Sequence, residues 1–330
     1  MLDRVLGLAS AVSFAIGAVS APAGPSGQVE LTFRDPDIVE SSGLVAAGDG
    51  LFLTTNDSGD GGRVFVVDGS GRTVGSTSWS PEPTDVEALA PAGPGEVWVG
   101  DIGDNPRARD SITVLRVPYG RTEQVVEPTA YELVYPDRAH DAESLLADPE
   151  TGRLYVISKD VFGGRVFAAP RRLSSEQPNR LVDVAPSFSF ATDGAFFPDG
   201  RHYVVRGYTS AAIYSFPGHE RIGSFPLPAQ QQGEGISVGA DDELYLSTEG
   251  QHTDLLRIAV PRQVARAMTP AAPTAETPEP VDVREDPDSS WWWLVGGALV
   301  VAVPTAASWL WLKRRPSPGA RPRDPAGSGS

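Results

Sequence analysis

Cysteine is absent from this chain of 330 residues. Its absence excludes disulfide bonds, thiolate catalysis and cysteine-ligated zinc sites together. The zincin motif HExxH is absent as well, so the sequence contains no metalloprotease helix of that kind. A folded domain of this chain must therefore be stable without covalent cross-links.

Basic residues are scarce, and lysine above all. Lys159 and Lys313 are the two lysines, and the formal net charge is −16. Residues 313–330 carry five basic residues and one acid, so the part of the chain that precedes them is more acidic still, at about −20. Such a body repels nucleic acid and anionic lipid and attracts cations, so no nucleic-acid partner is predicted.

Two apolar runs lie near the ends of the chain. Residues 1–23 have the layout of a secretory signal peptide, with an uncleaved anchor as the alternative. Residues 291–312 contain no charge, begin and end near tryptophans and precede a basic tail at 313–330, which predicts a transmembrane helix with the tail in the cytoplasm. Residues 269–290 are rich in Pro, Thr and acids and read as an extended stalk. The prediction is a single-pass protein of the cell membrane, with its body outside the cell.

A repeat occupies the remaining segment, residues 28–268. Its five units begin 45, 56, 50 and 41 residues apart, at Ser42, Glu87, Glu143, Asp193 and Glu234. Each unit holds short runs rich in β-branched and aromatic residues, with turns of Gly and Asp between them, and such runs are strands. The fold class is therefore all-β, and the repeat predicts a β-propeller of five four-stranded blades.

The first and last strands of the repeat predict how the ring closes. The last unit lacks a fourth strand, and QVELTFR, Gln28 to Arg34, supplies one from the N-terminus. Six blades remain open as an alternative, because Ser111 to Asp137 is long enough for an extra hairpin. The one helix expected in the ectodomain is Pro261 to Met268.

Carboxylates recur where the first strand of a unit begins. Glu87, Glu143, Asp193 and Glu234 hold this position, and Ser42 takes it in the first unit. First strands line the central channel of a propeller, so these groups should converge at one mouth and repel one another unless protons or a cation neutralise them. Oxygen-only ligands favour a hard divalent cation, Ca²⁺ first. The alternative is that the acids are inherited from one ancestral repeat and hydrogen-bond to turn backbone.

The second strand of each unit ends at the same mouth. Asp57 and Asp101 both follow an apolar run and open a D-x-G-D turn, which makes them candidate metal ligands. The third and fourth units carry Lys159, Arg206 and Tyr208 there instead. This mixture predicts that the mouth binds a small anionic or polar ligand bridged by the metal, with pairing between the cations and neighbouring acids as the alternative.

Two of the four histidines lie beside these segments. His140 precedes an acidic stretch, and His252 follows the Glu-Gly-Gln of the fifth unit. Both are candidate ligand-binding residues and general bases at the mouth, although a surface histidine without such a role is the commoner case.

Three segments resemble known propellers: DVEALA (Asp85 to Ala90), HDAESLLAD (His140 to Asp148) and QGEGISVG (Gln232 to Gly239). They resemble extracytoplasmic propellers grouped as phytase-like, or "esterase-like activity of phytase", proteins, and they are similar to gluconolactonase-type propellers. In the latter, an acid at the start of an inner strand helps bind a divalent metal. The resemblance implies this role for Glu87 and its counterparts in the third and fifth units, but no complete catalytic set matches.

The sequence thus predicts a membrane-anchored extracytoplasmic propeller with a cation-containing central mouth. The partner bound there is a small molecule, a wall component or a protein. A metal-dependent phosphoesterase or lactonase that uses the same mouth is one alternative, and a structural scaffold without bound metal is the other.

Overall fold

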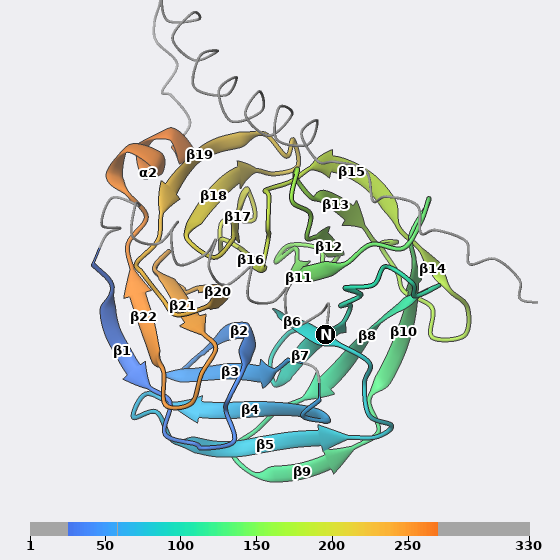
Figure 1. Cartoon of the computed structure of the whole chain (residues 1–330), viewed down its shortest axis with the longest axis horizontal. Helices are drawn as coiled ribbons and strands as arrows, with labels where there is room; N and C mark the ends of the chain where they lie inside the picture. The colour runs from blue at the N-terminus through green and yellow to red at the C-terminus, as the bar shows by residue number, and fades with distance from the viewer. Residues whose placement is uncertain (1–25, 58, 270–330) are drawn as a thin grey trace, which may run out of the picture. The chain divides into compact units, whose positions relative to one another are not determined.

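The computed structural model describes residues 26–57 and 59–269 of the chain (Figure 1). Their strands fall into five sheets that radiate from a central axis as the blades of a propeller. The predicted number of five blades is confirmed.

The first three blades follow one another along the chain, each with its innermost strand first. Blade 1 comprises β2 (Ser41–Gly48), β3 (Leu51–Asn56), β4 (Gly62–Asp68) and β5 (Thr73–Trp79). Blade 2 comprises β6 (Val86–Pro91), β7 (Glu96–Asp101), β8 (Ile112–Pro118) and β10 (Thr129–Val134). Blade 3 comprises β11 (Ala142–Ala147), β12 (Leu154–Ser158), β13 (Arg165–Ala168) and β15 (Val182–Pro186).

The last two blades have the same order, and the fifth is completed by the N-terminal strand. Blade 4 comprises β16 (Asp193–Phe196), β17 (His202–Arg206), β18 (Ser210–Ser215) and β19 (Arg221–Pro226). Blade 5 comprises β20 (Gly233–Val238), β21 (Leu244–Thr248), β22 (Asp254–Ile258) and β1 (Gln28–Thr32).

The long segment of residues 111–137 does not form a sixth blade. Besides β8 and β10 it contains β9 (Glu123–Val126), which pairs in parallel with β5 and adds a fifth strand to blade 1. A two-residue strand, β14 (Asn179–Arg180), extends blade 2 in the same way by pairing with β10. Both additions cover the outer edge of a preceding blade, which removes unpaired backbone groups from that edge.

The hydrophobic core lies between the blades. Each pair of neighbouring blades encloses one cluster of buried apolar side chains, including the pair formed by blades 5 and 1. The innermost strands β2, β6, β11, β16 and β20 lie next to one another around the axis.

We call the first residues of the five units, Ser42, Glu87, Glu143, Asp193 and Glu234, the repeat positions. Crowding at the axis explains the small residue that follows each of them. A Cβ at Gly43 would lie 2.5 Å from the backbone nitrogen of Leu89 in the next inner strand. Ala88 and Ser144 take the equivalent place in blades 2 and 3 and are fully buried. A larger side chain there would push the inner strands apart.

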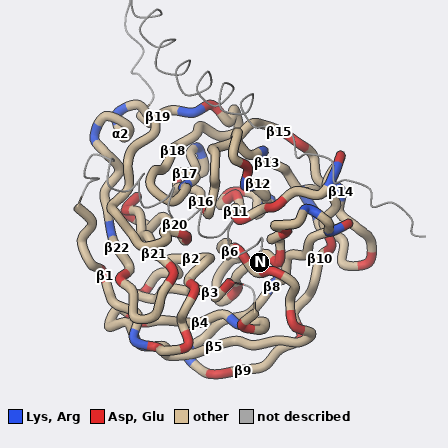
Figure 2. The backbone as a smooth tube through the Cα atoms, viewed as in Figure 1, with Lys and Arg blue, Asp and Glu red and all other residues tan. Residues whose placement is uncertain are grey.

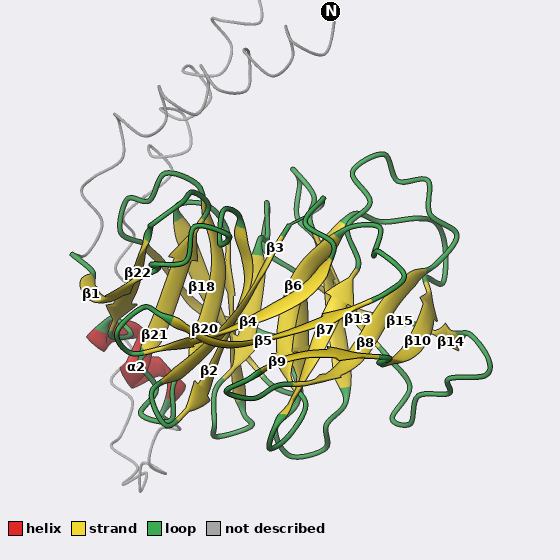
Figure 3. Ribbon diagram, turned by 90° about the horizontal axis from the view of Figure 1, so that it is seen from below, coloured by secondary structure: helices red, strands yellow, loops and turns green. Residues whose placement is uncertain are grey.

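The strands run between two loop-bearing faces (Figure 3). We call the face where the inner strands begin the mouth face and the opposite one the base face. Helix α2 (Arg262–Met268) follows β22 at the base face, where Val264 packs against Gly223 of β19. Because Gln28 pairs with Arg257 near the end of β22, the described chain both begins and ends at the base face.

Four predicted segments lie outside the described residues: the signal peptide, nearly all of the stalk, the transmembrane helix and the basic tail. Within residues 26–57 and 59–269, no helix has the length and apolar character needed to cross a bilayer.

Closure of the ring by β1 can be tested through its buried leucine. Leu31 is 5% exposed and lies opposite Leu255 of β22, whereas Val29 of the same strand is 50% exposed. We expect Leu31→Ala to lower the free energy of unfolding by about 2–4 kcal/mol through the cavity that it leaves. The control Val29→Ala should change it by less than about 0.5 kcal/mol. Urea unfolding measures both, and equal small effects would show that β1 does not hold the ring closed.

Candidate functional site at the mouth of the propeller

A cavity of about 190 Å³ opens at the mouth face, where the inner strands begin. All five blades contribute to its almost entirely polar wall, which consists of Ser42, Asp57, Glu87, Asn105, Glu143, Lys159, Tyr208, Gln232, Glu234 and Glu249. Figure 2 shows acidic residues close to the axis, near β6, β11 and β20. The predicted convergence of the repeat acids therefore holds for three of them, Glu87, Glu143 and Glu234.

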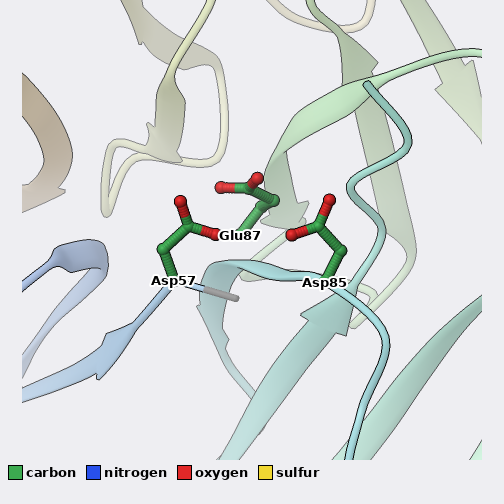
Figure 4. A group of neighbouring side chains, drawn as sticks. All are labelled: Asp57, Asp85 and Glu87. Atoms are coloured by element: carbon green, nitrogen blue, oxygen red, sulfur yellow. The ribbon is translucent and has the colours of Figure 1, made fainter. Parts of the chain in front are cut away.

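Three carboxylates on the side of blades 1 and 2 lie close enough to share one ion. Asp57 directly follows β3, Asp85 directly precedes β6 and Glu87 lies within β6. Each offers an oxygen within 4.8 Å of the others, and the three side chains point toward one another (Figure 4). Two oxygens bound to a single Ca²⁺ lie at most about 5 Å apart, because each Ca²⁺–oxygen bond measures roughly 2.3–2.6 Å. The spacing of the three oxygens fits that limit.

Burial and mutual repulsion make Glu87 and Asp85 hold protons strongly. Burial raises the pKa of Glu87 to about 10, and the charges of Glu143, Asp57 and Asp85 contribute to this rise. A hydrogen bond of 3.0 Å from the Ser42 hydroxyl lowers the pKa and so opposes the rise in part. Burial and the charge of Asp57 raise the pKa of Asp85 to about 6. A cation placed among the three would favour their ionised forms.

The opposite wall carries a fixed positive charge. The Lys159 ammonium donates a hydrogen bond to Glu143 Oε1 and lies 5.2 Å from the centre of the Tyr208 ring. Burial opposes the charge of Lys159, but the charge of Glu143 prevails and raises the pKa of the lysine, so the lysine stays protonated. Burial raises the pKa of Glu143 to about 8, although Lys159 works against this rise.

Glu249 was not among the predicted ligands, and it completes the wall on the side of blade 5. Burial and the charges of Glu234 and Glu40 raise its pKa to about 7, and the side chain of Gln232 donates a hydrogen bond to it. Glu249 stands where Asp57 and Lys159 stand in their own blades. The backbone N–H of each donates to the carbonyl of the residue two places before the repeat position, namely Gln232, Glu40 and Asp141.

The same backbone hydrogen bond shows that the two D-x-G-D turns are not equivalent. In blade 2 it comes from Gly103, whose N–H donates to Asp85 O, so Gly103 and not Asp101 corresponds to Asp57. A Cβ at Gly103 would lie 2.4 Å from Asp85 Oδ2, so glycine leaves the room that Asp85 occupies.

Asp101, a predicted metal ligand, is instead a support for the mouth. It is the last residue of β7, as Asn56 is of β3. Its carboxylate accepts hydrogen bonds from the N–H groups of Thr84 and Asp85 at 3.0 and 2.9 Å, and from Arg109 at 2.8 Å. Asp101 therefore positions Asp85 and does not line the cavity itself.

Asp193 and Arg206, predicted at the mouth, are buried within blade 4. Asp193 accepts hydrogen bonds of 2.8 Å from the N–H groups of Gly194 and Ile236, which ties β16 to β20. Arg206 donates to the carbonyls of Gly235 and Ser247 at 3.0 and 3.2 Å and is fully buried. For Asp193 the structure contains the alternative, hydrogen bonding to backbone N–H groups: the side chain is fully buried, and each of its carboxylate oxygens accepts one of these two bonds.

Neither candidate histidine lines the cavity. The ring of His140 hydrogen-bonds to Asp137 at 3.0 Å and packs against Tyr135 and Phe167 with ring centres 4.9 and 4.8 Å apart. His252 lies in the loop after β21, where its Nδ1 is 3.3 Å from Phe33 O. Both therefore serve packing and loop structure.

A second cavity of about 530 Å³ opens at the base face and is lined mainly by apolar residues of the inner strands. It contains Ser237, which lies in the sequence GISVG, a match to the G-x-S-x-G pattern of nucleophile elbows. Ser237 lies inside β20 and not at a strand-to-helix turn, and its hydroxyl accepts a hydrogen bond of 2.9 Å from Ala46 N–H. The match to the nucleophile-elbow pattern therefore reflects the packing of the inner strand β20 and not a catalytic turn.

Comparison with family models and with curated protein sequences gives no match. Among solved structures, the chain is similar to a gluconolactonase from Xanthomonas campestris, at 12% identity over 73% of this chain and 99% of that one, with a TM-score of 0.44. It is also similar to a glutaminyl cyclase from Myxococcus xanthus, at 10% identity over 72% of this chain and 98% of that one, with a TM-score of 0.47. At these identities the similarity concerns the propeller fold alone, and the resemblance to phytase-like propellers stays a prediction.

The buried carboxylates predict that stability falls as the pH rises. The pKa values of Glu87 (about 10) and Glu143 (about 8) exceed their ordinary value of 4.5, so above pH 4.5 the native state holds more protons than the unfolded state. In buffer with chelator we expect the free energy of unfolding to decrease from pH 5 to pH 8. Glu87→Gln should flatten this slope and stabilise the protein at pH 8 by roughly 1–3 kcal/mol, since one unit of pKa corresponds to about 1.4 kcal/mol.

Urea unfolding at several pH values measures the slope. Asp110→Asn is the matched control, because Asp110 is an exposed carboxylate of the same face, and its slope should equal that of the wild type. A stability that is flat between pH 5 and pH 8 would contradict the prediction.

Proposed function

We propose that this chain is a membrane-anchored extracytoplasmic binding module whose central mouth holds a divalent cation and binds a polar ligand or partner beside it. The observation that carries the proposal is the group of Asp57, Asp85 and Glu87, whose oxygens approach within 4.8 Å of one another. Residues 1–23 and 291–312 support the anchoring through their sequences.

The chemistry of the three side chains favours Ca²⁺. All of the ligand atoms are carboxylate oxygens, which hard cations prefer, and Ca²⁺ takes six to eight oxygens in flexible geometry. Three carboxylates therefore leave coordination positions for water or for a ligand. Lys159 lies across the same cavity and offers a hydrogen-bond donor to a polar group of that ligand.

Binding of the cation can be measured directly by calorimetry and thermal unfolding. We expect Ca²⁺ to raise the melting temperature, with a stabilisation of about 2.7 kcal/mol at a concentration 100 times the Kd. The affinity should increase with pH, because the carboxylates must release protons to bind the ion. Asp57→Asn combined with Glu87→Gln should abolish both the heat of binding and the shift.

Asp110→Asn serves again as the control and should bind Ca²⁺ as the wild type does. Mg²⁺, which needs a tighter octahedral shell, should bind more weakly. If the wild-type protein gives neither heat nor a thermal shift with either ion, the proposed cation site does not exist.

A metal-dependent hydrolase is the second candidate, and the protonation of the mouth favours it. Burial raises the pKa of Glu143, which accepts a hydrogen bond from the Lys159 ammonium, so a carboxyl group with raised proton affinity lies beside a fixed cation. A phosphoesterase or a lactonase would use such a pair to protonate a leaving group, with the metal binding the reacting oxygen.

Hydrolysis of a panel of phosphate esters and lactones, with Ca²⁺ and with chelator, tests this candidate. We expect any genuine activity to require the metal and to fall at least 100-fold in Glu143→Gln, because a general acid contributes roughly 10²- to 10⁴-fold. Activity that survives Glu87→Ala together with Glu143→Ala would arise elsewhere.

A further inference from the structure

Three apolar side chains are exposed together on the mouth face. Val161 and Phe162 lie at the tip of the loop between β12 and β13, and Phe190 lies in the connection from β15 to β16. Their exposed fractions are 55%, 97% and 42%. We call these three residues the loop-tip patch. An aromatic ring with nearly its whole surface in water contributes little to stability, and such rings often act as anchors in protein interfaces.

The patch is held in a fixed shape by the residues around it. The Asp160 carboxylate accepts hydrogen bonds from Arg107 at 3.1 Å and from Phe162 N–H at 3.2 Å. The Asp160 carbonyl accepts one of 3.0 Å from Phe190 N–H, which joins the two loops. Phe190 has a φ of 52°, a region that bulky residues rarely adopt. A patch ordered in this way before binding loses less conformational entropy when a partner docks.

The patch borders the cavity. Lys159, which lines the cavity wall, is followed directly by Asp160 and the loop tip. On the other side, Tyr208 lines the same wall, and its neighbour Gly207 lies against the carbonyl of Phe190. Successive side chains of an extended ligand point to opposite faces, so a ligand with one side chain on Phe162 would turn the side chain two residues further on toward the mouth.

Charge decides which ligand fits this surface. The cavity wall, together with Asp85 beside it, contains six carboxylates and one lysine, namely Asp57, Asp85, Glu87, Glu143, Glu234, Glu249 and Lys159. Without a cation, and with Glu87 and Glu143 protonated, the other four carboxylates and Lys159 give this group a formal charge of −3. An anionic lipid surface or an acidic peptide would be repelled, whereas a basic side chain would be attracted.

The size of the cavity also suits a basic side chain. A volume of about 190 Å³ corresponds to roughly six water-sized atoms, since a water occupies about 30 Å³ of the liquid. An arginine side chain has six non-hydrogen atoms beyond its Cβ.

We propose that the loop-tip patch and the mouth together dock an extended segment of a partner protein, with an apolar side chain on Phe162 and a basic side chain, two residues further along the segment, in the cavity. This inference rests on the proposed function in one respect, namely that binding takes place at the mouth, and it names the class of partner. It does not require the divalent cation. Both ends of the described chain lie at the base face, so neither crosses the docking surface.

Synthetic eight-residue peptides with blocked ends test the inference. One, the Phe-Arg peptide, carries a central Phe-Gly-Arg between Gly and Ser residues, and two comparison peptides, Phe-Glu and Ser-Arg, carry Phe-Gly-Glu or Ser-Gly-Arg in its place. In buffer with chelator, we expect calorimetry to show at least tenfold tighter binding of the Phe-Arg peptide than of either comparison peptide. Added salt should weaken this binding.

Variants of the protein assign the two contacts. Val161→Ser with Phe162→Ser should weaken binding of the Phe-Arg peptide at least tenfold and leave the melting temperature unchanged, since both side chains are exposed. Glu234→Gln should weaken binding of the Phe-Arg peptide but not of Phe-Glu. Val29→Ser is the matched control, because Val29 is an exposed apolar residue of β1, an outermost strand away from the mouth.

Three results would overturn the inference: no binding of the Phe-Arg peptide at 1 mM, equal binding of all three peptides, or unchanged binding by the variant of the patch. Cosedimentation with phosphatidylcholine and phosphatidylglycerol vesicles that depends on Phe162 would assign the patch to a membrane instead. Repeating the titrations with CaCl₂ separates this inference from the cation proposal, because the peptide binds without metal if the inference is right, even where no heat of Ca²⁺ binding is found.

Discussion

Close packing of the five inner strands around one axis is the constraint on which the rest of this structure depends. It admits only small residues such as Gly43, Ala88 and Ser144 next to the repeat position, and it therefore brings the preceding side chains together whatever their charge. Carboxylates at Glu87, Glu143 and Glu234 consequently share one small space with raised pKa. The strength with which these groups hold protons is a product of the fold and not of any one residue.

Blades 1, 3 and 4 each reduce this repulsion between carboxylates in a different way. Blade 1 has replaced the acid by Ser42, which donates a hydrogen bond to Glu87. Blade 3 places Lys159 against Glu143, and blade 4 turns Asp193 inward onto backbone N–H groups. On another side of the mouth, the carboxylates of Asp57 and Asp85 lie close to that of Glu87. The asymmetry of the site thus follows from the different ways in which blades 1, 3 and 4 reduce this repulsion.

Much of this architecture could be predicted from the sequence, because strands and turns are local patterns. The five units, the closing strand β1 and the helix near residue 262 all follow from runs of apolar residues and their spacing. The site was harder, because it depends on where single side chains point. Asp101 looked equivalent to Asp57, but one additional residue before Gly103 shifts the corner and turns Asp101 onto the backbone. Arg206 reads as a rim cation, yet its guanidinium lies inside blade 4, and nothing in the local sequence indicates that direction.

The pairing of β1 with β22 also sets the order in which the fold is completed. About 220 residues separate Leu31 from Leu255, so β1, the first strand of the described residues, has its partner only when nearly the whole propeller has been made. Until then blade 5 has no outer strand and β1 has no sheet, and both keep an open edge. The strand of the propeller that is synthesised first therefore closes it last. A chain truncated before β22 would lack the partner of β1 and could not close the ring.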